Sequence, residues 1–349
     1  MVNAMPKIEI YELERREEKE WDAYVLKHPN STFFHQIGWK RVVEKTYKHK
    51  PIYLIAREEG EVKGVLPLFL MRSLIFGKKL VSVPFAPYGG VCTDDKMIEN
   101  ALIEEARRIT KELGVDYLEL RNMTIKQGSD LLVKSLQVTS VLDLDPNPDI
   151  IWKKMKRDKR RGIKKAKEAN LEIIWGPKGL GDFYEIYAKT MWYLGTPVHS
   201  IKFFENIIHE FPDNTNIITV KYKNKAIASI FLLFFKEVAI SGWSGSLREY
   251  SRLYPNNFAY WEVLKYCCEK GYKFFDFGRS MPNSGIHKFK ESFGAKTKYL
   301  YYQYYLNNKD KIPDITVANP KRQKFANIWK KLPLKITTAI GPLIRKEIP

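Results

Sequence analysis

Residues 271–295, GYKFFDFGRSMPNSGIHKFKESFGA, say most about how this chain folds. Residues 274–277 (FFDF) predict a short, mostly apolar strand, in which Asp276 is a buried acid that is costly unless it is paired. A polar loop at 281–285 leads to a helix whose two phenylalanines share one face, because they are four residues apart. Lys290 lies beside that apolar face, near the end of the preceding strand. This order of strand, glycine-containing loop and lysine-bearing helix predicts a site for an anionic ligand.

Two sequence patterns each occur twice, in the same order and about 160 residues apart. Residues 56–70 and 220–234 each combine a strand, a turn residue and an apolar strand, which is the pattern of a hairpin. Residues 101–121 and 261–278 each combine an amphipathic helix, a glycine at its end and a strand that starts at once. A single helix-glycine-strand unit is common in α/β proteins, but these ordered pairs predict two copies of one α/β domain.

The length and composition of the chain agree with two domains. A chain of 349 residues, of which 44% are hydrophobic, can bury two cores of ordinary size. We expect a first domain at residues 1–150, a second domain at 151–308 and a basic amphipathic tail at 309–349. The tail alternates basic and apolar residues, so it could lie on a membrane surface or pack as a helix on the first domain.

The sequence shows no signal for export or for membrane insertion. The first residues lack an apolar segment of the kind found in signal peptides, and the longest apolar runs are too short to span a bilayer. The three cysteines cannot form a disulfide framework and lack zinc-binding spacing. We therefore expect a cytoplasmic protein, which could also lie on the inner face of the membrane.

Much of the net charge of +19 is concentrated in one segment. Residues 153–167 contain ten basic residues and one acid, and they follow the helix-breaking sequence DPNPD at 145–149. We expect a basic helix that opens the second domain. Arg160 and Arg161 in this helix would bind phosphate groups through bidentate contacts, whereas the lysines would act as point charges. The alternative is a solvated, lysine-rich surface helix.

The sequence lacks the motifs that identify several common enzyme classes. The six histidines have no metal-binding spacing, so we expect no catalytic metal and no bound cofactor. The chain has no G-x-S-x-G, Walker-type or G-x-G-x-x-G motif, which argues against hydrolase, ATPase and dinucleotide-binding functions. It also lacks the Q/R-x-x-G-x-G/A run that holds the pyrophosphate of acetyl-CoA at a helix N-terminus. This absence weakens acetyl-CoA as a donor without excluding it.

The motifs resemble those of the FemAB-type transferases, which are relatives of the GNAT acyltransferase fold. Members carry an apolar strand ending in D-F-G, a variable loop and then G-x-x-x-F-K-x-x-F-G, and this chain has these motifs at 276–278 and 285–294. Further similar segments are FFH at 33–35 with Trp39, PFAPYGGV at 84–91, RRGIKKA at 160–166, WYLGTPVHSIKFF at 192–204, and YPNN at 254–257 with YWE at 260–262. The resemblance covers approximately residues 30–305.

The resemblance implies a fold, a reaction and partners. The fold would be an α/β fold of two tandem GNAT-like domains, each a mixed sheet flanked by helices. In the family, an acceptor amine attacks the ester of an aminoacyl-tRNA and forms an amide bond. The acceptor is a nucleotide-linked or lipid-linked murein precursor, so both partners are polyanions, which a basic face would attract. Because the ester is already activated, neither a nucleophile nor a metal is needed, and family members often work as monomers.

The resemblance also implies roles for individual residues. Lys290 occupies the F-K position and would contact a donor or acceptor phosphate near the reaction centre. Arg160 occupies the R-x-x-I-[RK]-K-A position and would hold the acceptor pyrophosphate. Arg279 replaces the second glycine of the D-F-G-G sequence in better-known members, which leaves the substrate open. Asp276 could accept a proton from the attacking amine, or it could pair with Arg279 or with loop N–H groups.

Other candidate substrate contacts are Arg161, Lys288, Tyr88 and Tyr260. The small residues after Tyr88 permit close approach of a ligand or form a plain turn. Two alternatives to aminoacyl transfer remain open. The first is an acetyl-CoA-dependent N-acetyltransferase of surface polysaccharide synthesis. The second is a noncatalytic RNA-binding protein that uses the basic helix and does not depend on Lys290.

Overall fold

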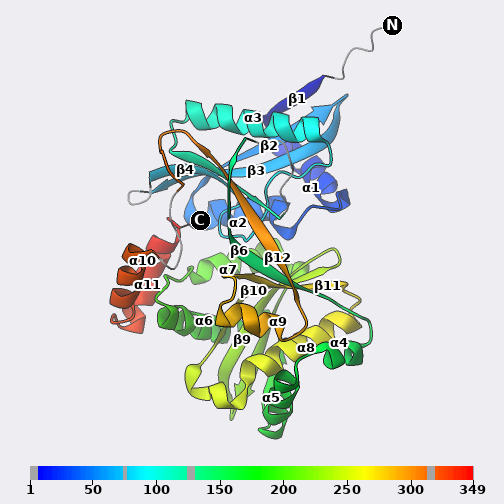
Figure 1. The fold of residues 1–349 in the computed structure, drawn as a ribbon, viewed down its shortest axis with the longest axis vertical. Coiled ribbons are helices and arrows are strands. Elements are labelled where there is room, and N and C mark those ends of the chain that lie inside the picture. The colour runs from blue at the N-terminus through cyan, green and yellow to red at the C-terminus, as the bar shows by residue number, and fades with distance from the viewer. Residues whose placement is uncertain (1–6, 74–76, 124–129, 313–318, 349) are drawn as a thin grey trace. The chain divides into compact units, whose positions relative to one another are not determined.

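The computed structural model describes residues 7–73, 77–123, 130–312 and 319–348 (Figure 1). These residues form two compact units, and each unit is built from segments that are distant in the sequence. Unit 1 contains the described residues up to 136 together with 299–312 and 346–348, and unit 2 contains residues 137–298 and 319–345. The unit boundary therefore falls at residues 136 and 137, not after residue 150. The first six residues of the chain and the predicted tail residues 313–318 and 349 lie outside the described residues.

Unit 1 is a mixed sheet with helices on its faces. Its strands are β1 (Ile8–Glu12), β2 (Lys50–Glu58), β3 (Glu61–Ser73), β4 (Gly77–Ser82), β5 (Tyr117–Asn122) and most of β12 (Lys296–Leu306), and its helices are α1 (Glu18–Lys27), α2 (Ile37–Tyr47) and α3 (Lys96–Glu112). The strand order is β1-β2-β3-β4-β5-β12, with β4 and β5 parallel and the other pairs antiparallel. The buried face of α3 packs on this sheet through Ile98, Leu102 and Ala106.

Unit 2 repeats this design with more helices. Its strands are most of β6 (Leu132–Asp143), β7 (Glu172–Trp175), β8 (Thr215–Tyr222), β9 (Lys225–Phe235), β10 (Val238–Ser246) and β11 (Phe274–Ser280), and its helices are α4 (Pro148–Lys154), α5 (Arg157–Glu168), α6 (Leu180–Leu194), α7 (Ile201–Glu210), α8 (Pro255–Glu269), α9 (Gly285–Glu291), α10 (Pro320–Trp329) and α11 (Leu334–Arg345). The strand order is β6-β11-β10-β9-β8-β7, and only the β10–β11 pair is parallel. Short 3-10 helices lie at Arg15–Glu17, Phe33–His35, Pro177–Gly179, Pro212–Asn214 and Arg248–Leu253.

Side chains alternate between the two faces of the unit 2 sheet. On β9, Ile230 and Leu232 join the core beneath α8, whereas Phe231 packs on Phe183 of α6 with ring centroids 5.5 Å apart. Helices therefore cover both faces. On the α8 side, α5 approaches α8 closely at Gly162, where an added Cβ would lie 2.9 Å from a ring carbon of Tyr254.

The predicted internal duplication is confirmed. Both predicted hairpins are present as β2–β3 and β8–β9, and in each of them the two turn residues have positive φ. The two helix-glycine-strand units are α3 with β5 and α8 with β11. The pairing of the sixth strand was not predicted. The sheet of unit 1 ends with β12 from late in the sequence, and the sheet of unit 2 ends with β6, so the two halves of the chain exchange a strand.

Two further expectations are corrected. The basic run at 153–167 is not one helix, because it is divided at Met155 and Lys156 between α4 and α5. Lys156 has extended backbone, and its N–H donates to Ser292 O at 3.0 Å, so a tertiary hydrogen bond breaks the helix. The C-terminal helices belong to unit 2, where α11 packs on α6, whereas the described tail residues 309–312 and 346–348 belong to unit 1. In the described part of the chain, no helix combines the length and apolar character needed to cross a membrane.

Candidate active site

A bulge in strand β11 shapes the candidate site in unit 2. The register between β11 and β6 shifts between Asp276 and Arg279, and Gly278 in this shift has φ +75. The carboxylate of Asp276 is fully buried and accepts hydrogen bonds from the N–H of Gly278, at 2.7 Å, and from the hydroxyl of Thr139. Asp276 therefore binds a loop N–H group, which was one of its two predicted roles. Its carboxylate fixes the conformation that turns the next carbonyl groups toward α9.

Lys290 of α9 is held against this bulge. Only 5% of the residue is exposed, and its ammonium group donates to the carbonyl oxygens of Gly278 and Arg279 at 2.6 and 3.0 Å. Helix α9 begins after Ser284, whose hydroxyl accepts from the N–H of His287 and caps the helix. Burial lowers the pKa of Lys290 from its usual 10.5 to about 8, Asp276 opposes this shift, and the charge of Arg279 adds to it. Lys290 is thus a buried cation whose protonation changes near physiological pH.

Aromatic side chains support the buried lysine. Phe289 and Phe293 pack against the ring of Tyr260 in α8, with centroids 5.6 and 5.9 Å apart from it. The Tyr260 hydroxyl lies 3.1 Å from Ser241 Oγ and 3.3 Å from Ser244 Oγ, and burial raises the pKa of this phenol. Tyr260 is therefore part of the aromatic cluster that positions α9, and its hydroxyl already has two partners.

Helix α5 places Lys159 against the same aromatic cluster. Its ammonium nitrogen lies 4.6 Å from the centroid of the Phe289 ring, and burial lowers the pKa of Lys159. Sequence reasoning singled out Arg160 and Arg161 but missed Lys159. The signal was present, because Lys159 is four residues before Ile163 and seven before Ala166, both of which are buried on the inner face of α5.

The predicted residues of the basic helix and of α9 differ in exposure. Arg160 is half-buried and Arg161 is exposed, and neither side chain makes a hydrogen bond or ion pair to another residue in the described ranges. Lys288 is also exposed. It is two residues from Lys290 on α9, so the two side chains project to nearly opposite sides of the helix. The structure therefore does not bring Lys288 together with Lys290.

Arg279 and Ser280 follow the bulge, and the first of them meets a cation from the tail. Partial desolvation and the charge of Arg279 lower the pKa of Arg322, which lies in α10. Sequence reasoning treated this tail as a membrane or packing element and missed Arg322. It also missed Ser280, whose buried hydroxyl has no hydrogen-bond partner among the described residues. Lys290 and Arg279 thus lie at one strand end of unit 2, and the charge of Arg279 also acts on Arg322.

Tyr88 lies in unit 1, whereas the other predicted site residues lie in unit 2. Its buried ring packs edge-on against Phe34 with centroids 5.6 Å apart. The neighbouring Gly89 N–H donates to Arg121 O at 3.0 Å. Within unit 1, this segment is therefore a packed turn.

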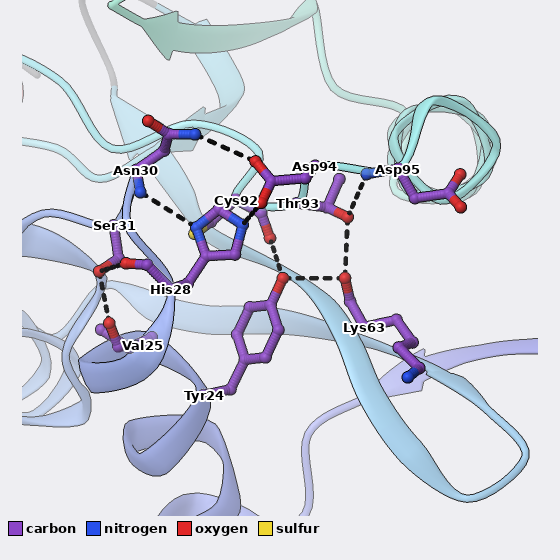
Figure 2. Close-up of polar contacts among 10 residues, drawn as sticks. All are labelled: Tyr24, Val25, His28, Asn30, Ser31, Lys63, Cys92, Thr93, Asp94 and Asp95. Atoms are coloured by element: carbon purple, nitrogen blue, oxygen red, sulfur yellow. Dashed lines mark hydrogen bonds and ion pairs between the residues drawn. The ribbon is translucent and has the colours of Figure 1, made fainter.

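A second polar cluster in unit 1 has the residue types of a nucleophilic triad (Figure 2). Cys92 Sγ lies 3.3 Å from His28 Nδ1, and His28 Nε2 lies 3.2 Å from a carboxylate oxygen of Asp94. The backbone N–H of Asn30 also donates to His28 Nδ1 at 3.2 Å, and the Asn30 side chain donates to Asp94 at 3.0 Å. The thiol and the imidazole are both buried. These contacts, with the hydroxyl of Tyr24 on Cys92 O, join the end of α1 to the loop before α3 and have a structural role.

Unit 1 also contains a pocket of about 360 Å³. It is lined by Tyr47, Lys48, His49, Lys50, Leu70, Arg72, Lys346 and Glu347. None of the predicted site residues lies in it. Among the residues that the structure describes, no group of three or more His, Cys, Asp or Glu side chains is arranged to hold a metal ion.

Comparisons with known proteins identify the fold class. Residues 153–291, which include Arg160, Asp276 and Lys290, match the family model described as an acetyltransferase (GNAT) domain. A tandem GNAT protein from the clavulanic acid biosynthesis pathway is 10% identical with a TM-score of 0.53, and the match covers 87% of this chain and 100% of that protein. A comparison with functionally curated sequences gives no significant match. The chain therefore has the tandem GNAT acyltransferase fold, as predicted.

Two further solved structures have a similar fold. FemX is 16% identical with a TM-score of 0.66, and the match covers 86% of this chain and 98% of FemX. The C-terminal domain of a proposed lysylphosphatidylglycerol synthetase from Agrobacterium fabrum is 10% identical with a TM-score of 0.57, over 84% of this chain and 92% of that domain. The fold is thus of the FemAB type, and the predicted resemblance is confirmed at the level of the fold.

Proposed function

We propose that this protein is a transferase that moves an aminoacyl group from aminoacyl-tRNA onto an amine of a cell-envelope precursor. The observation that carries this proposal is Lys290, a buried cation fixed on the carbonyl oxygens of Gly278 and Arg279 at the strand end where FemAB-type proteins carry their F-K motif. The similarity to the FemX fold supports the class of reaction. The similarity to the lysylphosphatidylglycerol synthetase domain supports an envelope component as acceptor.

The proposed reaction needs few chemical groups from the protein. The acceptor amine attacks the acyl carbon of the ester, a C–N bond forms, and the C–O bond to the tRNA ribose breaks. The amine loses a proton and the leaving ribose oxygen gains one, so the reaction is balanced without an added oxidant or hydrolysis step. The protein must hold two anionic partners together and stabilise the negative charge that develops on the carbonyl oxygen.

The cations of unit 2 suit this task. The ammonium group of Lys290 has three protons, and two of them are used by the carbonyls of Gly278 and Arg279. We assign its third proton to a phosphate or oxyanion of the bound substrates. Arg279 and Arg322 add positive charge at the same strand end, and Arg160, which has no protein partner in the described part of the chain, would hold the acceptor pyrophosphate.

We further propose that the reaction needs no resident cofactor and that the protein works as a monomer in the cytoplasm, on the inner face of the membrane. The lack of a membrane-spanning helix among the described residues is compatible with this location. Lipid-linked acceptors would be available at that surface. The basic C-terminal helices would supply the contact.

The test is transfer of radiolabel from a mixed pool of aminoacyl-tRNAs, and in parallel from labelled acetyl-CoA, into an extract of amine-bearing envelope precursors. We expect label to move from aminoacyl-tRNA. The variant Lys290→Met removes the charge but keeps most of the side-chain volume, and should lower the rate by about 100-fold or more, as loss of a transition-state donor does. The matched control is Lys178→Met, because Lys178 is exposed beside β7 at the opposite edge of the same sheet.

The second candidate function is acetyl transfer from acetyl-CoA to an amine of a surface polysaccharide. The match of residues 153–291 to an acetyltransferase domain favours it. Label moved only from acetyl-CoA would establish this function in place of the first. Binding of tRNA that is indifferent to aminoacylation and to Lys290→Met, without transfer from either donor, would instead indicate a noncatalytic RNA-binding protein.

A further inference from the structure

Helix α11 has three large apolar residues on the side that faces water. Its buried residues are Thr337 and Gly341, and Gly341 lies so close to Val198 that an added Cβ would be 3.0 Å from its methyl carbon. Leu334 and Ile344 are half-buried, whereas 46% of Ile336, 38% of Ile340 and 63% of Leu343 is accessible. These three residues are spaced by four and three positions, so they form one continuous stripe. Helix α11 therefore has large apolar side chains on its solvent side in addition to those on its packed side, and the packing of the helix in its own unit does not explain them.

Helix α10 adds to this exposed apolar surface. Its Trp329 is buried, but 37% of Phe325 and 55% of Ile328 are accessible. Phe325 and Ile328 are three residues apart and therefore lie on one side of α10. Two consecutive helices of the same unit thus each present large apolar side chains to solvent, which needs an explanation because such groups are normally isolated on soluble surfaces.

The charge of the same segment is one-sided. Residues 319–345 contain seven lysine and arginine residues and no aspartate or glutamate. Lys321, Lys324, Lys330, Lys331 and Lys335 are all exposed. A partner for this segment must therefore accept apolar side chains and carry negative charge.

We propose that Phe325, Ile328, Ile336, Ile340 and Leu343, with these five lysines, form a tail surface that binds the headgroup region of an anionic lipid bilayer. In such an interfacial contact the apolar side chains enter the boundary of the acyl chains, and the lysines remain at the level of the lipid phosphates. A bilayer meets both requirements at once, whereas a nucleic acid offers charge without an apolar layer. The tail surface excludes Arg322, on which the charge of Arg279 acts.

This inference extends the location that we proposed for the enzyme, but it does not depend on the transfer reaction. The full-length protein is sedimented with vesicles of phosphatidylglycerol and phosphatidylethanolamine, and with vesicles of phosphatidylcholine alone. We expect binding to the anionic vesicles to exceed binding to phosphatidylcholine at least tenfold, and to weaken as the salt concentration rises.

Two variants and two controls test the assignment of the surface. The triple variant Ile336→Ser/Ile340→Ser/Leu343→Ser and the triple variant Lys330→Gln/Lys331→Gln/Lys335→Gln should each lower vesicle binding about tenfold or more, since each removes one of the two required attractions. Because the replaced side chains are exposed, the variants should retain the thermal unfolding midpoint of the wild type. The controls replace exposed residues elsewhere, Met97→Ser with Ile174→Ser, and Lys178→Gln.

The outcomes separate this inference from the proposed reaction. Absence of wild-type binding, equal binding to both vesicle types, or binding unaffected by either triple variant would overturn it. Retention of tRNA that depends on the six side chains replaced in the two triple variants would assign the surface to RNA. Lys290→Met should bind vesicles as the wild type does, and the tail variants should still transfer label to a water-soluble acceptor. Failure of one proposal can therefore be detected independently of the other.

Discussion

Lys290 combines burial, two carbonyl partners and a pKa of about 8, so its charge can be changed by pH within the stable range of most proteins. If the ammonium form contacts substrate anions, transfer depends on that proton. The rate constant kcat/KM should then fall as pH rises through about 8, approaching about a tenfold loss per pH unit. The measurement is the pH profile of transfer from pH 6.5 to 9.5.

The control for this profile is Lys290→Met, whose residual activity should lack the alkaline loss. The variant also reports on stability. The folded pKa of Lys290 lies below its usual 10.5, so between about pH 8 and 10.5 the unfolded chain holds a proton that the folded protein lacks. Wild-type stability should therefore rise with pH across that window relative to Lys290→Met, and be independent of this group below it. An unchanged alkaline loss of activity in Lys290→Met would contradict the assigned role.

At Gly278 the positive φ and the carbonyl of Ser241, which would be 2.9 Å from an added Cβ, together disfavour any side chain. Gly278→Ala should destabilise the protein by about 1–3 kcal/mol, because the residue must keep a left-handed conformation for its N–H to donate to the Asp276 carboxylate. Gly285→Ala is the matched control, since its Cβ would meet no neighbouring atom within 4 Å and the residue begins α9. Gly285→Ala should stabilise the protein by up to about 1 kcal/mol. Urea unfolding midpoints measure the effects of both variants, and equal midpoints for the two variants would refute the role given to the bulge.

At the level of elements, the position of α5 depends on its contact with α8. An alanine at Gly162 would meet the side chains of Asn257 and Tyr254. Gly162→Ala should therefore cost about 1–3 kcal/mol by overpacking, and should weaken tRNA binding because α5 carries Lys159 and Arg160. Gly181→Ala in α6, which has open space around it, should instead stabilise by up to about 1 kcal/mol through lower backbone entropy. Thermal unfolding and tRNA binding together distinguish the two variants, and unchanged binding by Gly162→Ala would contradict the predicted role of α5.

Local patterns predicted the elements that depend on local physics. The hairpins at Gly60 and Asn224, the helices that stop at Gly114 and Gly271, and the strand around Asp276 were all expected, because turn residues and periodicity encode them directly. The break between α4 and α5 was not predicted. Residues 155 and 156 contain no glycine or proline, and the break depends on the carbonyl of Ser292.

The candidate site was also only partly predictable. Lys290 and Asp276 were found through their motif, which lies in one continuous segment. Arg322 comes from about thirty residues further along the chain, beyond β12, and no local pattern in the sequence links it to Arg279. Ser280 is distinguished only by a buried hydroxyl that has no hydrogen-bond partner within the described part of the chain, which is a property of the folded environment.

At the scale of the molecule, unit 1 needs a strand from the end of the sequence. Residues 301–306 of β12 pair with 117–122 of β5. A chain that ends at residue 298 should leave one edge of β5 unpaired, so the amide hydrogens of β5 should exchange much faster than in the full protein. A chain that ends at residue 312 keeps β12 and should retain this protection. Equal protection of β5 in both fragments, measured by hydrogen exchange, would contradict the importance of the exchanged strand.

The exchanged strand also sets the order in which a newly made chain can mature. The ribosome completes β5 more than 170 residues before it completes β12, and at about 5–20 residues per second this interval lasts on the order of ten seconds or longer. The contacts of Lys79 and His49 with the carbonyls of Glu347 and Lys346 come later still. The part of the protein that is synthesised first is therefore the last to be finished. During synthesis β5 offers an open edge to any other strand, so the danger of mispairing is greatest while the chain is still attached to the ribosome.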